Sequence, residues 1–254
     1  MQTFDSDGVT IAYIDVPAVG GTGDPVLLIH GFASNHAVNW VNTLWVRTLS
    51  QAGYRVIALD NRGHGESEKL YDPAAYSSEA MAGDALRLLD HLGIARADIM
   101  GYSMGARITA FLALDHAERV RSALFGGLGM HLVEGRGLPG GIAEALEAPP
   151  GTPAPNPTAQ AFRTFAEQTR SDLRALAACM RGSRQTLSRA EIAQIEVPAL
   201  VTVGTLDTVA GSAAGLAALM PNARALELPD RDHSTAVGAK AHRDGVLAFL
   251  AARP

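Results

Sequence analysis

A serine at position 103 lies within the pentapeptide GYSMG, residues 101–105. The apolar residues 97–100 before it are typical of a strand, and the apolar residues 108–114 after it are typical of a helix. The serine is therefore expected where a strand turns sharply into a helix. The flanking glycines lack the Cβ atoms that would collide in such a turn, which would lift the hydroxyl out of the sheet. The pattern predicts that Ser103 is a nucleophile.

A serine hydroxyl is a poor nucleophile at neutral pH and needs a base within hydrogen-bonding reach. His233 is the predicted base, because it follows a strand candidate and a polar turn. Asp207 ends an apolar strand candidate and is predicted to orient His233 and to stabilise its positive charge. Asp230 and Asp232 compete for this role, but such close sequence neighbours of the histidine are badly placed to reach around its ring.

Attack on a carbonyl group builds negative charge on its oxygen, and two fixed backbone N–H groups can stabilise that charge. Met104 directly follows the predicted nucleophile and would supply one N–H group. Phe32 stands in the loop after the strand candidate 26–30 and would supply the second. The side chains of both residues are expected to line the pocket.

Taken together, several motifs resemble the α/β-hydrolase fold family. They are His30-Gly31-Phe32, the segment DNRGHGES at residues 60–67, the GYSMG pentapeptide, Asp207 and His233, in the chain order serine, acid, histidine. The resemblance implies a carboxylesterase-like serine hydrolase with a mostly parallel, eight-stranded sheet flanked by helices and a helical cap insertion. It also implies an acyl-enzyme intermediate and no cofactor.

The order of the elements agrees with this fold class. Strands are expected at residues 2–4, 9–16, 26–30, 55–60, 97–102, 120–125, 198–203 and 223–228, and helices at 41–52, 78–92, 104–116, 211–220 and 235–250. Asp7-Gly8 suits a tight turn between the first two strands. The later alternation predicts a mostly parallel sheet with helices on both faces, so reactive groups should gather at the carboxyl ends of the strands.

The alternation breaks between Leu128 and Ala193, where no strong strand candidate occurs. We expect a core domain formed by residues 1–127 and 194–254 and a helical cap formed by residues 128–193. The proline-rich run 148–157 cannot continue a helix, so it is expected to link a short helical piece to a longer helix over 158–184.

Substrate contacts are expected from two places. Asn35 and His36, with their neighbours Ser34 and Asn39, follow the Phe32 loop, while Leu128, Met130 and Phe162 belong to the cap and could form an apolar pocket. The cap arginines would either pair with a substrate carboxylate or form a solvated face; they are Arg163, Arg170, Arg174, Arg181 and Arg184.

Composition limits the partners. The formal net charge is -5 and the basic residues are scattered, which leaves no electrostatic footprint for nucleic acid and favours a small-molecule ester substrate. The first residues have neither a basic start nor a long apolar run, and no segment approaches the about 20 apolar residues of a membrane span. We expect a cytoplasmic protein without a membrane partner; nothing in the sequence indicates its oligomeric state.

No metal or cofactor is expected. The lone Cys179 cannot form an internal disulfide and is expected to be a core residue. His30 and His64 stand in separate turn motifs without carboxylate-histidine spacing, so a structural role is expected for both. Asp60 and Arg62 are assigned to the same scaffold.

Other activities remain open for this arrangement. An enol-lactonase and a carbon-carbon bond hydrolase would use the same three residues, and a cofactor-free perhydrolase or haloperoxidase would use peroxide as the second nucleophile. A ligand receptor with slow or no turnover is the alternative of another class. Ser103 argues against the halide- and epoxide-cleaving branches of the family, which place an aspartate at this position.

Overall fold

The computed structural model describes residues 1–20, 23–136 and 138–253. Gly21, Thr22, Gly137 and Pro254, which fall within the ranges expected for the core and the cap, lie outside the described residues. The strands are β1 Gln2–Ser6, β2 Val9–Val16, β3 Pro25–Ile29, β4 Arg55–Leu59, β5 Ala97–Tyr102, β6 Val120–Gly126, β7 Ala199–Gly204 and β8 Ala223–Leu228. They form one 8-stranded sheet in the order β1-β2-β4-β3-β5-β6-β7-β8.

The sheet is antiparallel only at its amino-terminal edge. β2 pairs antiparallel with both β1 and β4, and the remaining neighbours pair in parallel. Asp7 and Gly8 connect β1 to β2 with φ angles of 56° and 81°, the left-handed geometry of a two-residue hairpin turn. The predicted fold class, a mostly parallel sheet flanked by helices, is confirmed.

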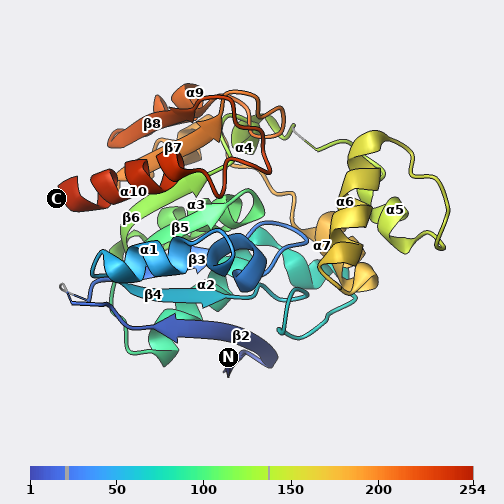
Figure 1. Cartoon of the computed structure of the whole chain (residues 1–254), viewed down its shortest axis with the longest axis horizontal. Helices are drawn as coiled ribbons and strands as arrows, with labels where there is room; N and C mark the ends of the chain where they lie inside the picture. The colour runs from blue at the N-terminus through green and yellow to red at the C-terminus, as the bar shows by residue number, and fades with distance from the viewer. Residues whose placement is uncertain (21–22, 137, 254) are drawn as a thin grey trace.

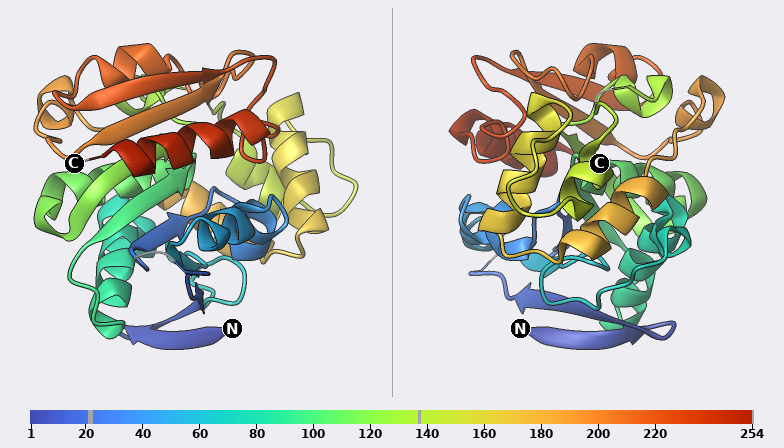
Figure 2. Two further views of the ribbon diagram at one scale, coloured as in Figure 1. Left: turned by 60° about the vertical axis from the view of Figure 1, so that its left-hand side comes forward. Right: turned by 90° about the vertical axis from the view of Figure 1, so that its right-hand side faces the viewer.

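Helices cover both faces of the sheet (Figures 1 and 2). α1 (Trp45–Gln51) and α10 (Lys240–Ala252) lie on one face, and α2 (Ser78–His91), α3 (Met104–Asp115) and α9 (Ala213–Ala217) lie on the other. The side chains of β3 are buried on both faces of the sheet. Leu27 and Ile29 belong to the core on one face, and Val26 and Leu28 belong to the core on the other. Within the described ranges, no helix is long and apolar enough to cross a membrane.

Five helices separate β6 from β7, and the described residues of this stretch contain no strand. These inserted helices are α4 His131–Glu134, α5 Ile142–Glu147, α6 Pro157–Gln168, α7 Leu173–Gly182 and α8 Arg189–Ile192. α5, α6 and α7 pack together at the end of the sheet where the parallel strands terminate (Figure 1). Pro157 begins α6, and the Asn156 side chain caps it by accepting a hydrogen bond from the Ala159 N–H group.

The single helix predicted over 158–184 is wrong, because the chain leaves helical geometry between α6 and α7. Arg170 adopts a left-handed conformation with φ of 53°. Asp172 then starts a new helix: its carboxylate accepts hydrogen bonds from the N–H groups of Arg174 and Ala175, each at 3.0 Å. The helix predicted over 235–250 also differs, since residues 234–239 form turns and α10 begins at Lys240.

Burial lowers the pKa of three fully buried histidines, His30, His64 and His242, and this couples folding to pH. Burial lowers the pKa of His242 to about 4, although its ring also contacts the Thr202 hydroxyl at 2.8 Å. Burial and the neighbouring His30 lower the pKa of His64 to about 3. Both rings are therefore neutral in the folded protein at pH 5, whereas an unfolded chain would protonate them below about pH 6.5.

Stability should consequently fall as the pH is lowered from 7 to 5. The unfolded state binds more protons in this window, so the contribution of each histidine is complete above about pH 6.5 and is lost as the pH falls toward its folded-state pKa. His64 and His242 together should lower the free energy of unfolding by about 4 kcal/mol between pH 7 and pH 5, and His30 adds to this fall. Urea unfolding at several pH values measures this, and His242→Gln should reduce the slope. A stability that is flat over this window would contradict the argument.

Candidate active site

Ser103 occupies a sharp turn between β5 and α3. Its φ and ψ angles are 54° and -112°, a conformation that L-residues seldom adopt. The Ser103 N–H group donates to the Gly126 carbonyl at 2.7 Å, and the Ser103 carbonyl accepts from the Arg107 N–H group at 3.1 Å. Strain of this kind persists only where the surrounding structure enforces it.

The glycines of the turn enforce it by allowing close backbone contact. A Cβ atom on Gly101 would lie 2.0 Å from the Gly105 carbonyl oxygen. A Cβ atom on Gly105 would lie 1.9 Å from the carbonyl oxygen of Ile29 in β3. Only glycine fits at either position, as the sequence pattern predicts.

Three strand ends bring Ser103, Asp207 and His233 together. Ser103 follows β5, Asp207 follows β7 and His233 follows β8. The His233 Nε2 atom lies 3.0 Å from the Ser103 hydroxyl, and its Nδ1 atom lies 2.8 Å from the Asp207 carboxylate. Because an ionised carboxylate only accepts, Nδ1 donates to Asp207 and leaves Nε2 as an acceptor for the serine proton. The row can thus move a proton from Ser103 to His233.

Further hydrogen bonds hold the acid and the base in place. The Asp207 side chain is fully buried, with 0% exposure, and its second oxygen accepts from the N–H groups of Val209 at 2.8 Å and Ala210 at 3.0 Å. The Tyr102 hydroxyl donates to the His233 carbonyl at 2.6 Å. Asp232 instead accepts from N–H groups of its own turn, and so does not compete with Asp207 for the imidazole ring.

The loop after β3 lies beside Ser103, because a Cβ atom on Gly31 would lie 3.5 Å from the Ser103 Cβ atom. The Asn39 side-chain oxygen accepts from the Gly31 N–H group at 3.0 Å, which fixes the start of this loop. Neither the Phe32 nor the Met104 N–H group donates a hydrogen bond to the described part of the chain, and both residues line the same cavity as Ser103. Their role at a developing oxyanion remains a prediction.

The loop after β4 packs against the loop after β3. Burial would raise the pKa of Asp60, but its hydrogen bonds to His36 and Glu66 and the nearby His30 lower it to about 2. The His30 Nδ1 atom donates to the Gly31 carbonyl at 2.7 Å, and its Nε2 atom accepts from the Asn61 N–H group at 3.0 Å. These contacts engage the polar groups of the loop with one another.

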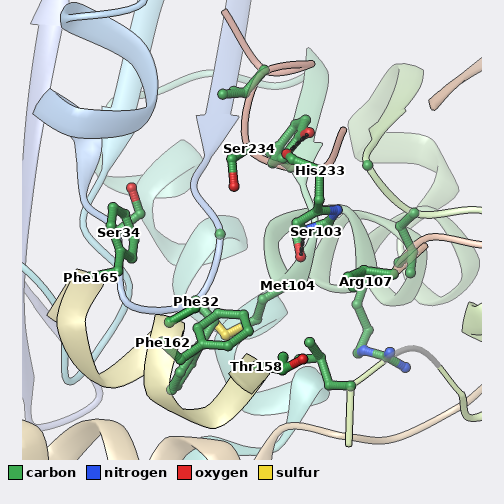
Figure 3. Close-up of a pocket in the computed structure, with 18 of the residues that line it drawn as sticks. Phe32, Ser34, Ser103, Met104, Arg107, Thr158, Phe162, Phe165, His233 and Ser234 are labelled. Carbon is green, nitrogen blue, oxygen red and sulfur yellow. Dashed lines mark hydrogen bonds between the residues drawn. The ribbon is translucent and has the colours of Figure 1, made fainter. Parts of the chain in front are cut away.

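A cavity of about 650 Å³ opens beside Ser103 (Figure 3). Its walls are mostly apolar and come from the core loops and the inserted helices; among them are Phe32, Met104, Leu128, Phe162, Phe165 and Met180. Of the predicted substrate contacts, Ser34, Asn39, Leu128 and Phe162 line this cavity. Their contact with a substrate remains a prediction.

Asn35, His36 and Met130 were predicted to contact substrate but are not among the described residues that line the cavity. The Asn35 side chain accepts from the Val38 N–H group at 2.9 Å. The His36 ring binds Asp60 at 2.9 Å. Met130 is buried against Gly215 of α9. In each case a contact within the protein uses the side chain that the prediction assigned to a ligand.

Most cap arginines also have partners within the protein. Arg163 is buried and donates to the Ala145 and Ala148 carbonyls, and Arg181 pairs with Glu147 at 2.7 Å. Arg184 does line the cavity.

Sequence reasoning missed a cavity residue, Arg107. It is the single charged residue of α3 before Asp115, and it lies one helical turn after Ser103. A single charged residue on an apolar helix, four positions after the predicted nucleophile, could have indicated a role in the site.

The Cys179 side chain is buried. Burial raises the pKa of the Cys179 thiol to about 12, so this side chain behaves as a core residue. No group of histidine, cysteine, aspartate and glutamate side chains that could hold a metal ion occurs in the part of the chain that the structure describes.

Comparisons with known proteins agree with the fold. The family model for the alpha/beta hydrolase fold matches residues 24–128. A hydrolase from Pseudomonas aeruginosa PA01 superposes with a TM-score of 0.79 and 27% identity, covering 99% of this chain and 98% of that one. The enol-lactonase from Burkholderia xenovorans LB400 gives a TM-score of 0.73 and 27% identity, covering 98% and 100%.

A sequence relative shares only part of its length with this chain. Epoxide hydrolase 3 from Siraitia grosvenorii is 33% identical over 120 residues, which is 47% of this chain and 36% of that protein. The shared region therefore spans about a third of that relative.

Replacing Gly105 tests the packing that creates the turn. Gly105→Ala should lower the free energy of unfolding by about 3 kcal/mol or more, because the new methyl group would overlap the Ile29 carbonyl and force β3 and α3 apart. Gly140→Ala is the matched control: no atom lies within 4 Å of its added Cβ, so stability should change by less than about 0.5 kcal/mol. Urea unfolding measures both, and equal effects would contradict this account.

Proposed function

We propose that this chain, which belongs to the α/β-hydrolase fold family, is a serine hydrolase that cleaves carboxylic esters through an acyl-enzyme intermediate. One observation carries the proposal: Ser103, His233 and Asp207 form a continuous hydrogen-bonded row that opens into an apolar cavity. Small-molecule esters of modest size fit a cavity of this kind.

The first half of the reaction forms the acyl-enzyme. The Ser103 oxygen attacks the ester carbonyl carbon while His233 Nε2 takes the serine proton. Asp207 orients the ring and stabilises its positive charge, and the Phe32 and Met104 N–H groups bind the carbonyl oxygen as it becomes negative. The carbon–oxygen bond to the alcohol then breaks, and His233 returns the proton to the departing alcohol.

Water completes the cycle by the same route. His233 takes a proton from a water molecule as the water oxygen attacks the acyl carbonyl. The bond to Ser103 breaks, the proton returns to the serine oxygen, and the carboxylic acid leaves. No group outside the row is needed for the proton balance of either half.

The inserted residues 128–193 would act as a cap that selects substrates, while residues 1–127 and 194–254 form the catalytic core. Phe162 and Phe165 of α6 and Met180 of α7 support this division, because they line the cavity and belong to the inserted helices. The core would then determine the chemistry and the cap would determine the substrate.

A lactone is the second candidate substrate, since the enol-lactonase resembles this chain over its full length. The same steps open a lactone, with the alcohol remaining attached to the acyl group. An epoxide is a weaker candidate despite the relative named epoxide hydrolase 3, because serine is a poor nucleophile toward an alkyl carbon.

Replacing the nucleophile tests the proposal. Purified protein should hydrolyse 4-nitrophenyl butyrate without added cofactor or metal, and Ser103→Ala should reduce kcat by about 10⁴-fold or more. Ser188→Ala, which removes the cap of α8 away from the cavity, should keep the parent rate. A phosphonate inhibitor should add its mass at Ser103. Equal activity of the parent and Ser103→Ala proteins would exclude the mechanism.

Replacing the acid separates orientation from attack. Asp207→Asn should lower kcat by about 10³- to 10⁴-fold with a small change in KM, because an amide at this position favours the wrong imidazole tautomer. Asp230→Asn removes an exposed carboxylate near His233 and should leave kcat within about twofold. Steady-state kinetics with the same ester distinguishes them; a larger loss for Asp230→Asn would assign the acid to Asp230 instead.

A further inference from the structure

Arg107 places a cation inside the cavity, one helical turn from the predicted nucleophile. Its N–H group donates to the Ser103 carbonyl, and its side chain lines the cavity wall. Burial and the nearby Arg184 lower the pKa of Arg107 to about 10. The guanidinium group is still positively charged at neutral pH.

The protein leaves most of this guanidinium unpaired. One Nη1 hydrogen goes to the Gln185 carbonyl. No carboxylate among the described residues forms an ion pair with Arg107, and its Nε and Nη2 atoms donate to none of these residues. Arg62 and Arg181, in contrast, both have carboxylate partners at 2.7 Å.

The rest of the cavity wall also carries positive charge without nearby negative charge. Arg136 and Arg184 also line it, and the described lining residues include no aspartate, glutamate or lysine. This positive region lies in a chain whose formal net charge is -5. The positive potential is therefore local to the cavity and does not follow from composition.

A largely buried charge without a counter-ion is costly, because desolvation is not offset by a partner. A bound anion would offset it. With Nη1 engaged by Gln185, the free edge of Arg107 is formed by Nε and Nη2, which present two parallel N–H groups. That geometry fits the two oxygens of a carboxylate.

We propose that the cavity takes substrates that carry a carboxylate, which Arg107 binds through its Nε and Nη2 edge while Arg136 and Arg184 add to the positive potential. The inference rests on the proposed ester hydrolysis at Ser103. His233 must protonate the leaving alcohol, and Figure 3 shows Arg107 extending away from Ser103 on the side opposite His233. The carboxylate therefore belongs to the acyl part of the ester.

Two esters of equal chain length test the assignment. Mono-4-nitrophenyl adipate ends in a carboxylate, and 4-nitrophenyl hexanoate ends in a methyl group. Arg107→Gln should reduce kcat/KM for the adipate ester about 10- to 100-fold more than for the hexanoate ester, the usual effect of losing a charged hydrogen bond. Arg107→Lys keeps the charge without the fork and should show a smaller loss. Arg181→Gln, on an exposed ion pair outside the cavity, should leave the ratio unchanged.

An unchanged ratio in a folded Arg107→Gln protein would overturn the proposal. Failure of the ester mechanism would look different, with no Ser103-dependent hydrolysis of either ester. In that case the carboxylate site is tested alone: calorimetry should detect adipate binding to Ser103→Ala protein and its loss when Arg107→Gln is added. Inorganic phosphate competing as well as adipate would contradict a carboxylate site and indicate a general anion site.

Discussion

The close approach of α3 to β3 is the constraint on which the site depends. Gly105 lies so near the Ile29 carbonyl that no side chain fits between them, which fixes the start of α3 against the sheet. Ser103 is then held at φ of 54°, at a cost on the order of 1–3 kcal/mol. The apolar face of α3 and the hydrogen bond from Ser103 to Gly126 offset that cost. The turn directs the serine hydroxyl toward His233 before any ligand binds.

The rest of the row depends on strand order, not on the inserted helices. β7 and β8 lie beyond β6 in the sheet, so the loops that follow them carry Asp207 and His233 to the strand end occupied by Ser103. Asp207 accepts hydrogen bonds from two backbone N–H groups as well as from His233. The Tyr102 hydroxyl connects the His233 loop to β5 by a hydrogen bond. The inserted helices contribute walls to the cavity and no member of this row. Insertions there can change the cavity without disturbing the hydrogen-bonded row.

The sequence predicted the features that depend on residues close together in the chain. Alternating apolar runs, the Asp7-Gly8 turn and the GYSMG pentapeptide were sufficient for the sheet and for the serine turn. The sequence did not predict the break between α6 and α7, because the apolar residues keep their helical spacing across it. The break is marked by Asp172, whose side chain caps the first turn of α7. The contact of His36 with Asp60 could not be predicted, because the two residues are distant in sequence. Contacts between residues that are far apart in the chain leave no periodic pattern in the sequence.

Arg107 also bears on the energetics of the reaction proposed for Ser103. A substrate carboxylate and a developing oxyanion are like charges, and they repel one another in a cavity where the effective dielectric constant is lower than in water. A guanidinium paired with the carboxylate cancels most of that repulsion in the transition state. Arg107 lies one turn into α3, whose first N–H group, that of Met104, is predicted to bind the oxyanion. One helix could therefore stabilise both negative charges, which makes a carboxylate-bearing acyl group compatible with efficient attack.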